Sequence, residues 1–485
     1  MAMKIGKMDW IFLVLCLLLG FLGEEAFFRS EIGISYITFI VAFYLVFFWR
    51  FRGFPFSHQR FGYLILCCIW LLAASFFLYD NQVFYVLNSL IIPVLVLLHL
   101  VLITSAKKLQ WNQWIFISYL FSRLLAAMRY IVSFIEVLSK GIKVGKDESK
   151  FLVWKKIFIG ILLSLPVLFV VMNLLITADS QFSRIIGGFP QWFNQLDAAI
   201  IMRIIITLIY TFAFFGFMQV LFHKQIKAIK QHINIQTPQM DAVITITVLV
   251  LMNVVYLLFA VVQFKYLFSG TLKGEFTYAE YARKGFFELL FVSLINLSIT
   301  IIVVNFVNRT TKVTKLLTQL LLTILILSSG VMLLSASMRL SIYEEAYGFS
   351  FIRVLSHSFM IFLAVIFVYT LIKIWIEKLS LFHFYFITAL VYYSAINIID
   401  LNQIVVKQNI ARYEQTGKID VHYLNNLSST GVLGLIDLFE KDQHIPDLRR
   451  VLVERKNEML RDEAPWQSYN LKKALVKEKL NGINL

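Results

Sequence analysis

Long apolar runs that alternate with short polar segments are the dominant pattern along this chain. A helix needs about 20 mostly apolar residues to cross the hydrocarbon core of a bilayer. Eleven runs approach or exceed that length, which predicts an all-α, polytopic membrane protein with about eleven transmembrane helices. The predicted spans are residues 9–23, 31–49, 61–79, 83–104, 151–176, 197–222, 241–268, 285–307, 313–336, 351–376 and 381–400.

The segment 111–138 is apolar enough to cross a membrane, but it has the pattern of a helix that lies in the membrane surface. Its polar residues recur at helical spacing on one face, with tryptophans before them and lysines after them. We therefore predict an interfacial amphipathic helix; if the segment crosses instead, the orientation of everything after it inverts. The polar face consists of Ser118, Ser122, Arg129, Ser133 and Glu136.

Beyond Leu401 the long apolar runs give way to short amphipathic helices. We expect the last span to continue as one helix to Gly417, a suitable C-cap, and Asp420 to cap a short helix after it. The remaining tail predicts a small helical module. Its apolar surface is too small for an independently stable domain, so we expect it to dock on the outer loops; a partner-binding module is the alternative.

These patterns divide the chain into four predicted parts. Residues 1–104 form an N-terminal four-span segment, and residues 105–150 form a basic cytoplasmic segment that contains the interfacial helix. Residues 151–400 form a seven-span core, and residues 401–485 form an extracytoplasmic helical module.

The composition agrees with a membrane protein. Of the 485 residues, 59% are apolar and only 15% are charged, whereas about a quarter of the residues in a soluble domain are charged. The three cysteines lie in apolar runs without metal-ligand spacing, and the phosphate-binding, dinucleotide-binding, zinc-protease and nucleophile-elbow motifs are absent from the sequence. We therefore expect no catalytic residue, no metal and no cofactor, and we favour a protein that is not an enzyme.

The formal net charge of +16 would suit a nucleic acid as partner, but its distribution indicates membrane orientation instead. The basic residues lie in short clusters between apolar runs, as the positive-inside rule describes. With the N-terminus inside, the inner segments of residues 1–400 hold 23 Lys and Arg, and the outer side holds 9. We therefore predict the lipid bilayer as the partner, no nucleic acid, an inside N-terminus and an outside C-terminus.

Ionisable residues within or at the ends of spans are costly, which makes them candidates for function. In the predicted orientation most of them approach from the outer face, where the positive-inside rule makes arginine rare. Because arginine binds phosphate and carboxylate in a bidentate manner, we predict an outward-facing polar pocket for an anionic lipid head group or another extracytoplasmic ligand. The candidate residues are Arg203, Glu280, Arg283, Glu288, Arg339, Tyr343, Glu344, Tyr347, Arg353 and His357.

A structural role is the competing interpretation of the same residues. Charges at helix mouths pair with one another and hold helix ends in place, as Arg283 with Glu288 or Arg339 with Glu344 would do. A lone histidine such as His357 is more often a packing residue than a ligand. Asparagines within spans are expected to form interhelical hydrogen bonds; they are Asn173, Asn253, Asn296 and Asn305.

Several outer segments resemble a known family. They are residues 278–290 (YAEYARKGFFELL), 339–350 (RLSIYEEAYGFS) followed by Arg353, 409–413 (NIARY) and 420–428 (DVHYLNNLS). In these strings the chain resembles the bacterial membrane proteins called domain of unknown function 4153 and 4173, over roughly residues 150–430. The resemblance implies a bacterial cytoplasmic membrane protein and supplies no active site. Leu340 stands where the family often has Met.

Three classes of function are compatible with the sequence. We favour a non-enzymatic envelope protein with a sensory, assembly or accessory role, which binds a ligand or a protein partner through the outer residues. The first alternative is a membrane transporter, which a continuous polar path to the inner face would support. The second is a polyprenol-phosphate-dependent glycosyltransferase, in which Glu24 and Glu25 of the first outer loop would stand where such enzymes have an acidic catalytic residue.

Overall fold

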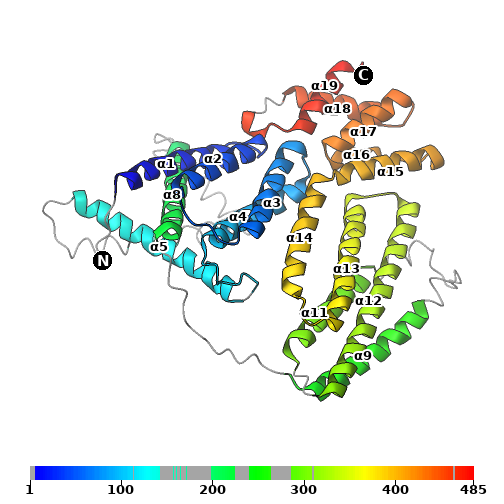
Figure 1. The fold of residues 1–485 in the computed structure, drawn as a ribbon. Coiled ribbons are helices and arrows are strands. Elements are labelled where there is room, and N and C mark those ends of the chain that lie inside the picture. The colour runs from blue at the N-terminus through cyan, green and yellow to red at the C-terminus, as the bar shows by residue number, and fades with distance from the viewer. Residues whose placement is uncertain are drawn as a thin grey trace. The chain divides into compact units, whose positions relative to one another are not determined.

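The structure is a computed structural model that describes residues 6–112, 114–142, 198–223, 240–263, 286–307, 311–461 and 465–484, with isolated helical positions at 157, 160, 164 and 171. Within these ranges the regular secondary structure is helical (Figure 1), apart from one isolated β-bridge between Met240 and Val307. The chain divides into two compact units. Unit 1 comprises residues 1–63, 94–229 and 465–468, and unit 2 comprises residues 64–93, 230–464 and 469–485. The all-α prediction is confirmed.

Ten of the described helices are long and apolar enough to cross a membrane. They are α1 (Lys7–Phe28), α3 (Gln59–Leu78), α4 (Gln82–Thr104), α5 (Trp114–Ile142), α8 (Ala198–His223), α9 (Ala242–Gln263), α11 (Phe286–Phe306), α12 (Lys312–Tyr347), α13 (Phe351–Trp375) and α14 (Leu381–Ile398). Nine match predicted spans, and α5 covers the segment predicted to be interfacial. The predicted span 31–49 forms the shorter helix α2 (Ile34–Arg50). The predicted span 151–176 lies outside the described residues, except for the four isolated positions.

The helix α12 extends well beyond the span predicted at 313–336. It has 36 residues, or about 54 Å of helix, whereas the hydrocarbon core is about 30 Å thick. The prediction ended where polar residues begin, but polar residues do not break a helix. Gly348 ends it, with φ of 86° and ψ of 174°, a conformation almost restricted to glycine. Gly348 thus forms the turn after which α13 begins at Phe351.

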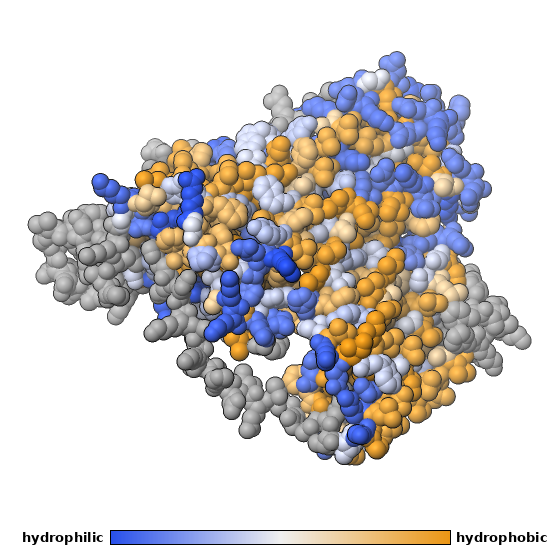
Figure 2. Space-filling view, viewed as in Figure 1, coloured by the Kyte–Doolittle hydropathy of each residue, from blue (hydrophilic) through white to orange (hydrophobic). Residues whose placement is uncertain are grey.

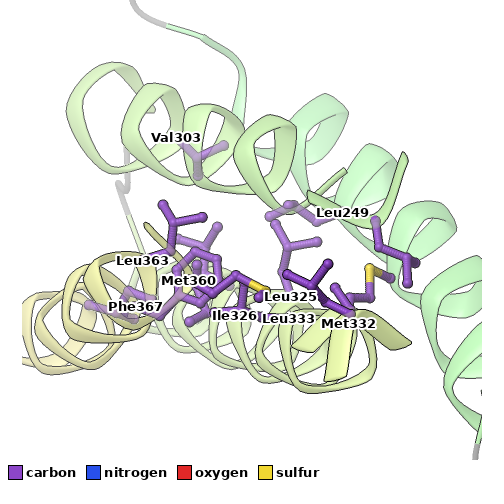
Figure 3. Packing of buried hydrophobic residues seen from close by; sticks show 14 residues of the cluster. Leu249, Val303, Leu325, Ile326, Met332, Leu333, Met360, Leu363 and Phe367 are labelled. Atoms are coloured by element: carbon purple, nitrogen blue, oxygen red, sulfur yellow. The ribbon is translucent and has the colours of Figure 1, made fainter. Parts of the chain in front are cut away.

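Apolar side chains from four helices form the core of unit 2. α12 packs against α9, α11 and α13, and its buried side chains meet those of all three neighbours (Figure 3). The labelled core residues are Leu249, Val303, Leu325, Ile326, Met332, Leu333, Met360, Leu363 and Phe367. Hydrophobic residues also cover much of the outer surface of α12 and α13 (Figure 2), which is the surface expected of helices that face lipid.

Unit 1 is built on the close packing of α1 against α8 and α2. Gly20 of α1 lets the two helix backbones approach, because a Cβ atom there would meet the carbonyl oxygen of Thr207 at 2.5 Å. Small residues permit such contacts between membrane helices. His99 of α4 is buried and shares a hydrogen bond of 2.9 Å with the hydroxyl of Tyr44 of α2. His99 is therefore a packing residue.

The C-terminal region consists of short helices around a small apolar core. They are α15 (Leu401–Thr416), α16 (Val421–Leu427), α17 (Ser429–Lys441), α18 (Leu448–Arg461), the 3₁₀ helix η3 (Trp466–Ser468) and α19 (Leu471–Gly482). Hydrogen bonds join this region to the α3–α4 loop through Asp80 and Ser429, and to α3 through Asn470. Within unit 2 the C-terminal region thus contacts the α3–α4 loop and the end of α3; its expected docking on the outer side stays a prediction.

The caps of α15 and α16 are those predicted from the sequence, but the connection between α14 and α15 differs from the prediction. Gly417 adopts φ of 68° and caps α15, and the Asp420 side chain caps α16, as predicted. The last span was expected to continue to Gly417 as one helix. Instead α14 ends at Ile398, and the Asp400 side chain accepts a hydrogen bond from the backbone N–H of Gln403 to begin α15. An N-cap of this kind starts a new helix direction.

We expect Gly348→Ala to lower the free energy of unfolding by about 1–3 kcal/mol, because an L-residue is strained in this conformation. The added Cβ would also meet Oδ1 of Asn409 at 2.9 Å. Thermal unfolding of the detergent-purified full chain measures the change. Gly330→Ala is the matched control, since Gly330 lies within α12 and a Cβ there meets nothing within 4 Å. A Gly348→Ala protein as stable as the wild type would show that the turn does not depend on glycine.

Candidate functional site

Six of the ten candidate residues lie together in unit 2, where α12 passes into α13. Arg339, Tyr343 and Tyr347 follow one another at four-residue spacing along α12, so that they share one side of the helix. Gly348 then folds the chain back, which brings the first turns of α13 alongside the last turns of α12. We call the six residues the α12–α13 cluster; they are Arg339, Tyr343, Glu344, Tyr347, Arg353 and His357.

Glu344 and His357 form the buried contact of this cluster. Nε2 of His357 lies 3.0 Å from Oε2 of Glu344, whose side chain is only 5% exposed. The other carboxylate oxygen of Glu344, Oε1, is buried and has no hydrogen-bond partner among the described residues. Since a buried carboxylate is tolerated only when it is paired, His357 holds Glu344 in place. His357 is therefore more than an isolated packing residue.

Arg353 is the cation of the cluster that remains available to a ligand. It donates a hydrogen bond to the carbonyl of Gly348, and its guanidinium carbon lies 4.2 Å from the centre of the Tyr343 ring. The Tyr347 ring lies 4.9 Å from the Tyr343 ring. Among the described residues, no carboxylate pairs with the half-buried Arg353. Arg339 differs, because it is buried. A stacked guanidinium with open donors can bind phosphate or carboxylate.

An apolar groove between α12 and α13 begins at His357. Its volume is about 690 Å³, which lies within the range of about 300–1,000 Å³ for small-molecule sites. On α13 the lining extends from His357 to Leu371, about 21 Å along the helix. Arg353 lies one turn before His357 on the same face. On α12 the groove is widened by Gly330, where a Cβ atom would meet open space.

Arg203 belongs to unit 1, where it forms a structural ion pair. Nε of Arg203 lies 3.0 Å from Glu24, whose side chain is 3% exposed, and Nη2 lies 3.4 Å from Glu25. Glu25 also pairs with Arg29 and accepts a hydrogen bond from Gln467. Two carboxylates thus engage Arg203, and this arrangement favours the structural interpretation. It also gives no support to Glu24 as an exposed catalytic acid.

The remaining candidates are Glu288, Glu280 and Arg283. Glu288 lies in the first turn of α11 with an exposed side chain, where a carboxylate is favoured by the helix dipole. Glu280 and Arg283 lie outside the described residues, so the proposed pairing of Arg283 with Glu288 stays a prediction.

Three residues of the C-terminal region, which were not among the candidates, hold the turn of the cluster. Asn409 of α15 exchanges two hydrogen bonds with the backbone of Phe349, at 3.1 and 2.8 Å. Arg412 donates to the carbonyls of Glu345 and Ala346, which are free acceptors at the end of α12. The Tyr423 hydroxyl accepts from the backbone N–H of Phe351 at 2.9 Å. These residues lie in the strings 409–413 and 420–428, whose resemblance to a family was the available signal.

A second buried polar network joins α3, α4 and α14 in unit 2. The amide of Asn88 donates to Ser75 at 2.9 Å and to Asn397 at 2.7 Å, and it accepts from the Tyr393 hydroxyl at 2.6 Å. A cavity of about 20 Å³ lies beside it, which is room for about one water molecule. Each side chain of the network has a partner, which is the signature of a helix-packing contact.

The asparagines predicted to link helices do so in two cases. Asn253 of α9 donates to the carbonyl of Leu321 at 3.0 Å, and Asn296 of α11 donates to the Ser329 hydroxyl at 2.9 Å. Asn305 instead donates to the carbonyl of Ile301 in its own helix, because that carbonyl is one turn away. Asn173 lies outside the described residues.

The described part of the chain has no group of three or more His, Cys, Asp or Glu side chains placed to hold a metal ion. Cys16 and Cys68 are buried and Cys67 is exposed.

Comparison with known proteins agrees with the family resemblance of the four sequence strings. The family described as domain of unknown function (DUF4153) matches residues 66–438, which is more than half of the chain. The chain therefore belongs to this family and is a multi-pass integral membrane protein. No curated protein and no solved structure matches it.

We expect His357→Ala to destabilise the protein by about 1–3 kcal/mol, because it leaves the buried carboxylate of Glu344 without a partner. Glu344→Gln in the same chain should restore much of the loss, since a neutral amide is less costly to bury than a carboxylate. Thermal unfolding of the single and double variants measures both effects. If His357→Ala unfolds at the wild-type temperature, the contact does not stabilise the cluster.

Proposed function

We propose that this member of the domain of unknown function 4153 family is a non-enzymatic envelope protein that binds an anionic, lipid-like ligand. The ligand would place its apolar tail in the groove between α12 and α13 and its head group at Arg353. In this proposal the protein lies in the bacterial cytoplasmic membrane, with an inside N-terminus, an outside C-terminus and an outward-facing cluster.

The observation that carries the proposal is the position of Arg353 at the end of the groove. One face of α13 presents Arg353, then His357, then only apolar lining residues to Leu371. A charge followed by about 21 Å of apolar lining matches the order of groups in an amphipathic lipid. The groove is longer than one leaflet of a hydrocarbon core, which is about 15 Å.

The chemistry of the cluster supports an anionic head group. Arg353 presents a planar fork of donors, and the Tyr343 ring holds that fork from one side. Glu344 is already paired with His357, so that it does not compete for Arg353. Phosphate and carboxylate share this recognition chemistry, and the length of the groove favours a lipid over a soluble anion.

The contacts of the C-terminal region support a sensory or accessory role. Arg353 donates to the carbonyl of Gly348, and Asn409 and Arg412 hold the same turn from α15. A ligand that moves Arg353 would therefore act on a segment that α15 contacts directly. A change at the head group would thus reach the C-terminal helices.

We expect Arg353→Gln to weaken binding of an anionic phospholipid about tenfold or more, because one charge-assisted contact contributes about 1.5–3 kcal/mol. Native mass spectrometry of the full chain with added phosphatidylglycerol or phosphatidylcholine measures retention. The variant should lose the preference for the anionic lipid. Arg449→Gln is the matched control, since Arg449 is an exposed arginine of α18 outside the cluster.

Gly330→Leu should lower retention of both lipids, because it adds a side chain to the groove at a position where a Cβ atom meets open space. Binding of glycerol phosphate, a head group without a tail, should stay unchanged in this variant. Leu316→Trp adds bulk at an exposed α12 position outside the groove and should have no effect. Retention equal to wild type in both Arg353→Gln and Gly330→Leu would overturn the proposal. A soluble anion as the ligand would be indicated if only the arginine variant lost binding.

A further inference from the structure

Polar contacts mark the two ends of unit 1. At one end, Asp9 of α1 accepts hydrogen bonds from Arg50 of α2 at 2.6 Å and from Gln219 of α8 at 2.8 Å. At the other end, Arg203 of α8 pairs with Glu24 of α1. The helices α1 and α8 are therefore antiparallel. Since Asp9 and Glu24 are 15 residues apart, the two ends are separated by about 23 Å.

The chain passes from the Asp9 end to the Glu24 end between α4 and α8. Ser57 follows α2 at the Asp9 end, and it hydrogen bonds to the carbonyls of Ile103 and Ser105, where α4 ends. The helix α8 begins at the Glu24 end. One crossing between α4 and α8 is enough to connect these two ends. If the predicted span 151–176 is that crossing, α5 is not a second one.

Burial divides α5 into three strips along its length. The strip against the rest of unit 1 is buried, and the exposed side splits into an apolar strip and a polar strip. The buried strip consists of Phe116, Arg123, Ala127 and Phe134. The exposed apolar strip consists of Ile117, Phe121, Leu125 and Met128. The exposed polar strip begins beside the exposed Ile115 and includes Ser118, Arg129 and Ser133.

A transmembrane α5 would place its polar strip against acyl chains along its whole length. Arg129 is the sixteenth of the 29 residues of α5, which would put it near the centre of the bilayer at a cost of about 2.5–3.5 kcal/mol. It is exposed, and no carboxylate pairs with it in the described part of the chain. A helix that lies along the surface avoids this cost, because one exposed strip meets acyl chains and the other meets head groups.

The middle of α5 packs close to the Asp9 end of the bundle. The Phe134 ring lies 4.6 Å from the Phe215 ring, and Ile131 lies against Gly216. Phe215 precedes Gln219 by one turn of α8, about 6 Å along the axis. Interfacial helices reach about 5–10 Å into the boundary between head groups and acyl chains. The contacts therefore place the middle of α5 at interfacial depth.

From these observations we propose that α5 is a lipid-binding surface helix at the Asp9 end of unit 1. Its exposed apolar strip lies in the acyl chains of one leaflet, and Arg129 contacts lipid phosphates. In the predicted orientation this is the cytoplasmic leaflet. The partner is the bilayer surface itself, which distinguishes α5 from the ligand groove of unit 2.

Cysteine accessibility in membrane vesicles of known orientation tests the proposal. In a background where Cys16, Cys67 and Cys68 are alanine, Ser118→Cys and Ser133→Cys are each treated with a membrane-impermeant maleimide from one side and then from the other. The two serines are 15 residues apart, about 23 Å along α5. We expect both cysteines to react from the same side, and Leu125→Cys on the apolar strip to be protected.

Ser298→Cys is the matched control, because Ser298 is an exposed serine near the middle of α11. It should be protected from both sides, as a residue at acyl-chain depth is. Labelling of Ser118→Cys and Ser133→Cys from opposite sides would show that α5 crosses the membrane. Protection of either cysteine from both sides would also overturn the proposal, because it would place the polar strip in the hydrocarbon core.

Discussion

The length of α12 is the constraint on which the candidate site depends. A helix of 36 residues is longer than the hydrocarbon core is thick, so part of it extends beyond the acyl chains, and its polar C-terminal residues favour the last turns. Those turns carry the polar residues of the α12–α13 cluster, and Gly348 returns the chain beside them. The same projection brings the turn within reach of Asn409 and Arg412 of α15. One long helix thus connects the apolar core, the cluster and the C-terminal region of unit 2.

Three ion pairs of the described helices neutralise charged groups within the protein, as a medium without hydrogen-bonding solvent favours. Arg203 pairs with Glu24, Arg50 with Asp9, and His357 with Glu344. Each of these pairs joins two helices and holds their ends in register. Arg353 differs, because it stacks on Tyr343 and, within the described residues, meets no carboxylate. Within the α12–α13 cluster, that difference makes it the residue most suited to an external anion.

The sequence predicted the helical class and most spans, because an apolar run long enough to cross a bilayer usually forms a transmembrane helix. It also placed six candidate residues on neighbouring turns, since the strings around Arg339 and Arg353 adjoin Gly348. It assigned Arg203 to the same pocket, whereas its neighbours are Glu24 and Glu25, about 180 positions earlier in the chain. Such long-range pairing leaves no periodic signal. The groove could not be foreseen either, because Gly330 and the apolar lining look like any membrane helix.

The most direct measurement of the central claim is a cryo-electron microscopy map of the full chain in nanodiscs that contain phosphatidylglycerol. The proposal predicts elongated density along the groove from Leu371 to His357, ending in a head group within hydrogen-bond distance of Arg353. A groove closed by contact between α12 and α13, or one whose density ends away from Arg353, would contradict it.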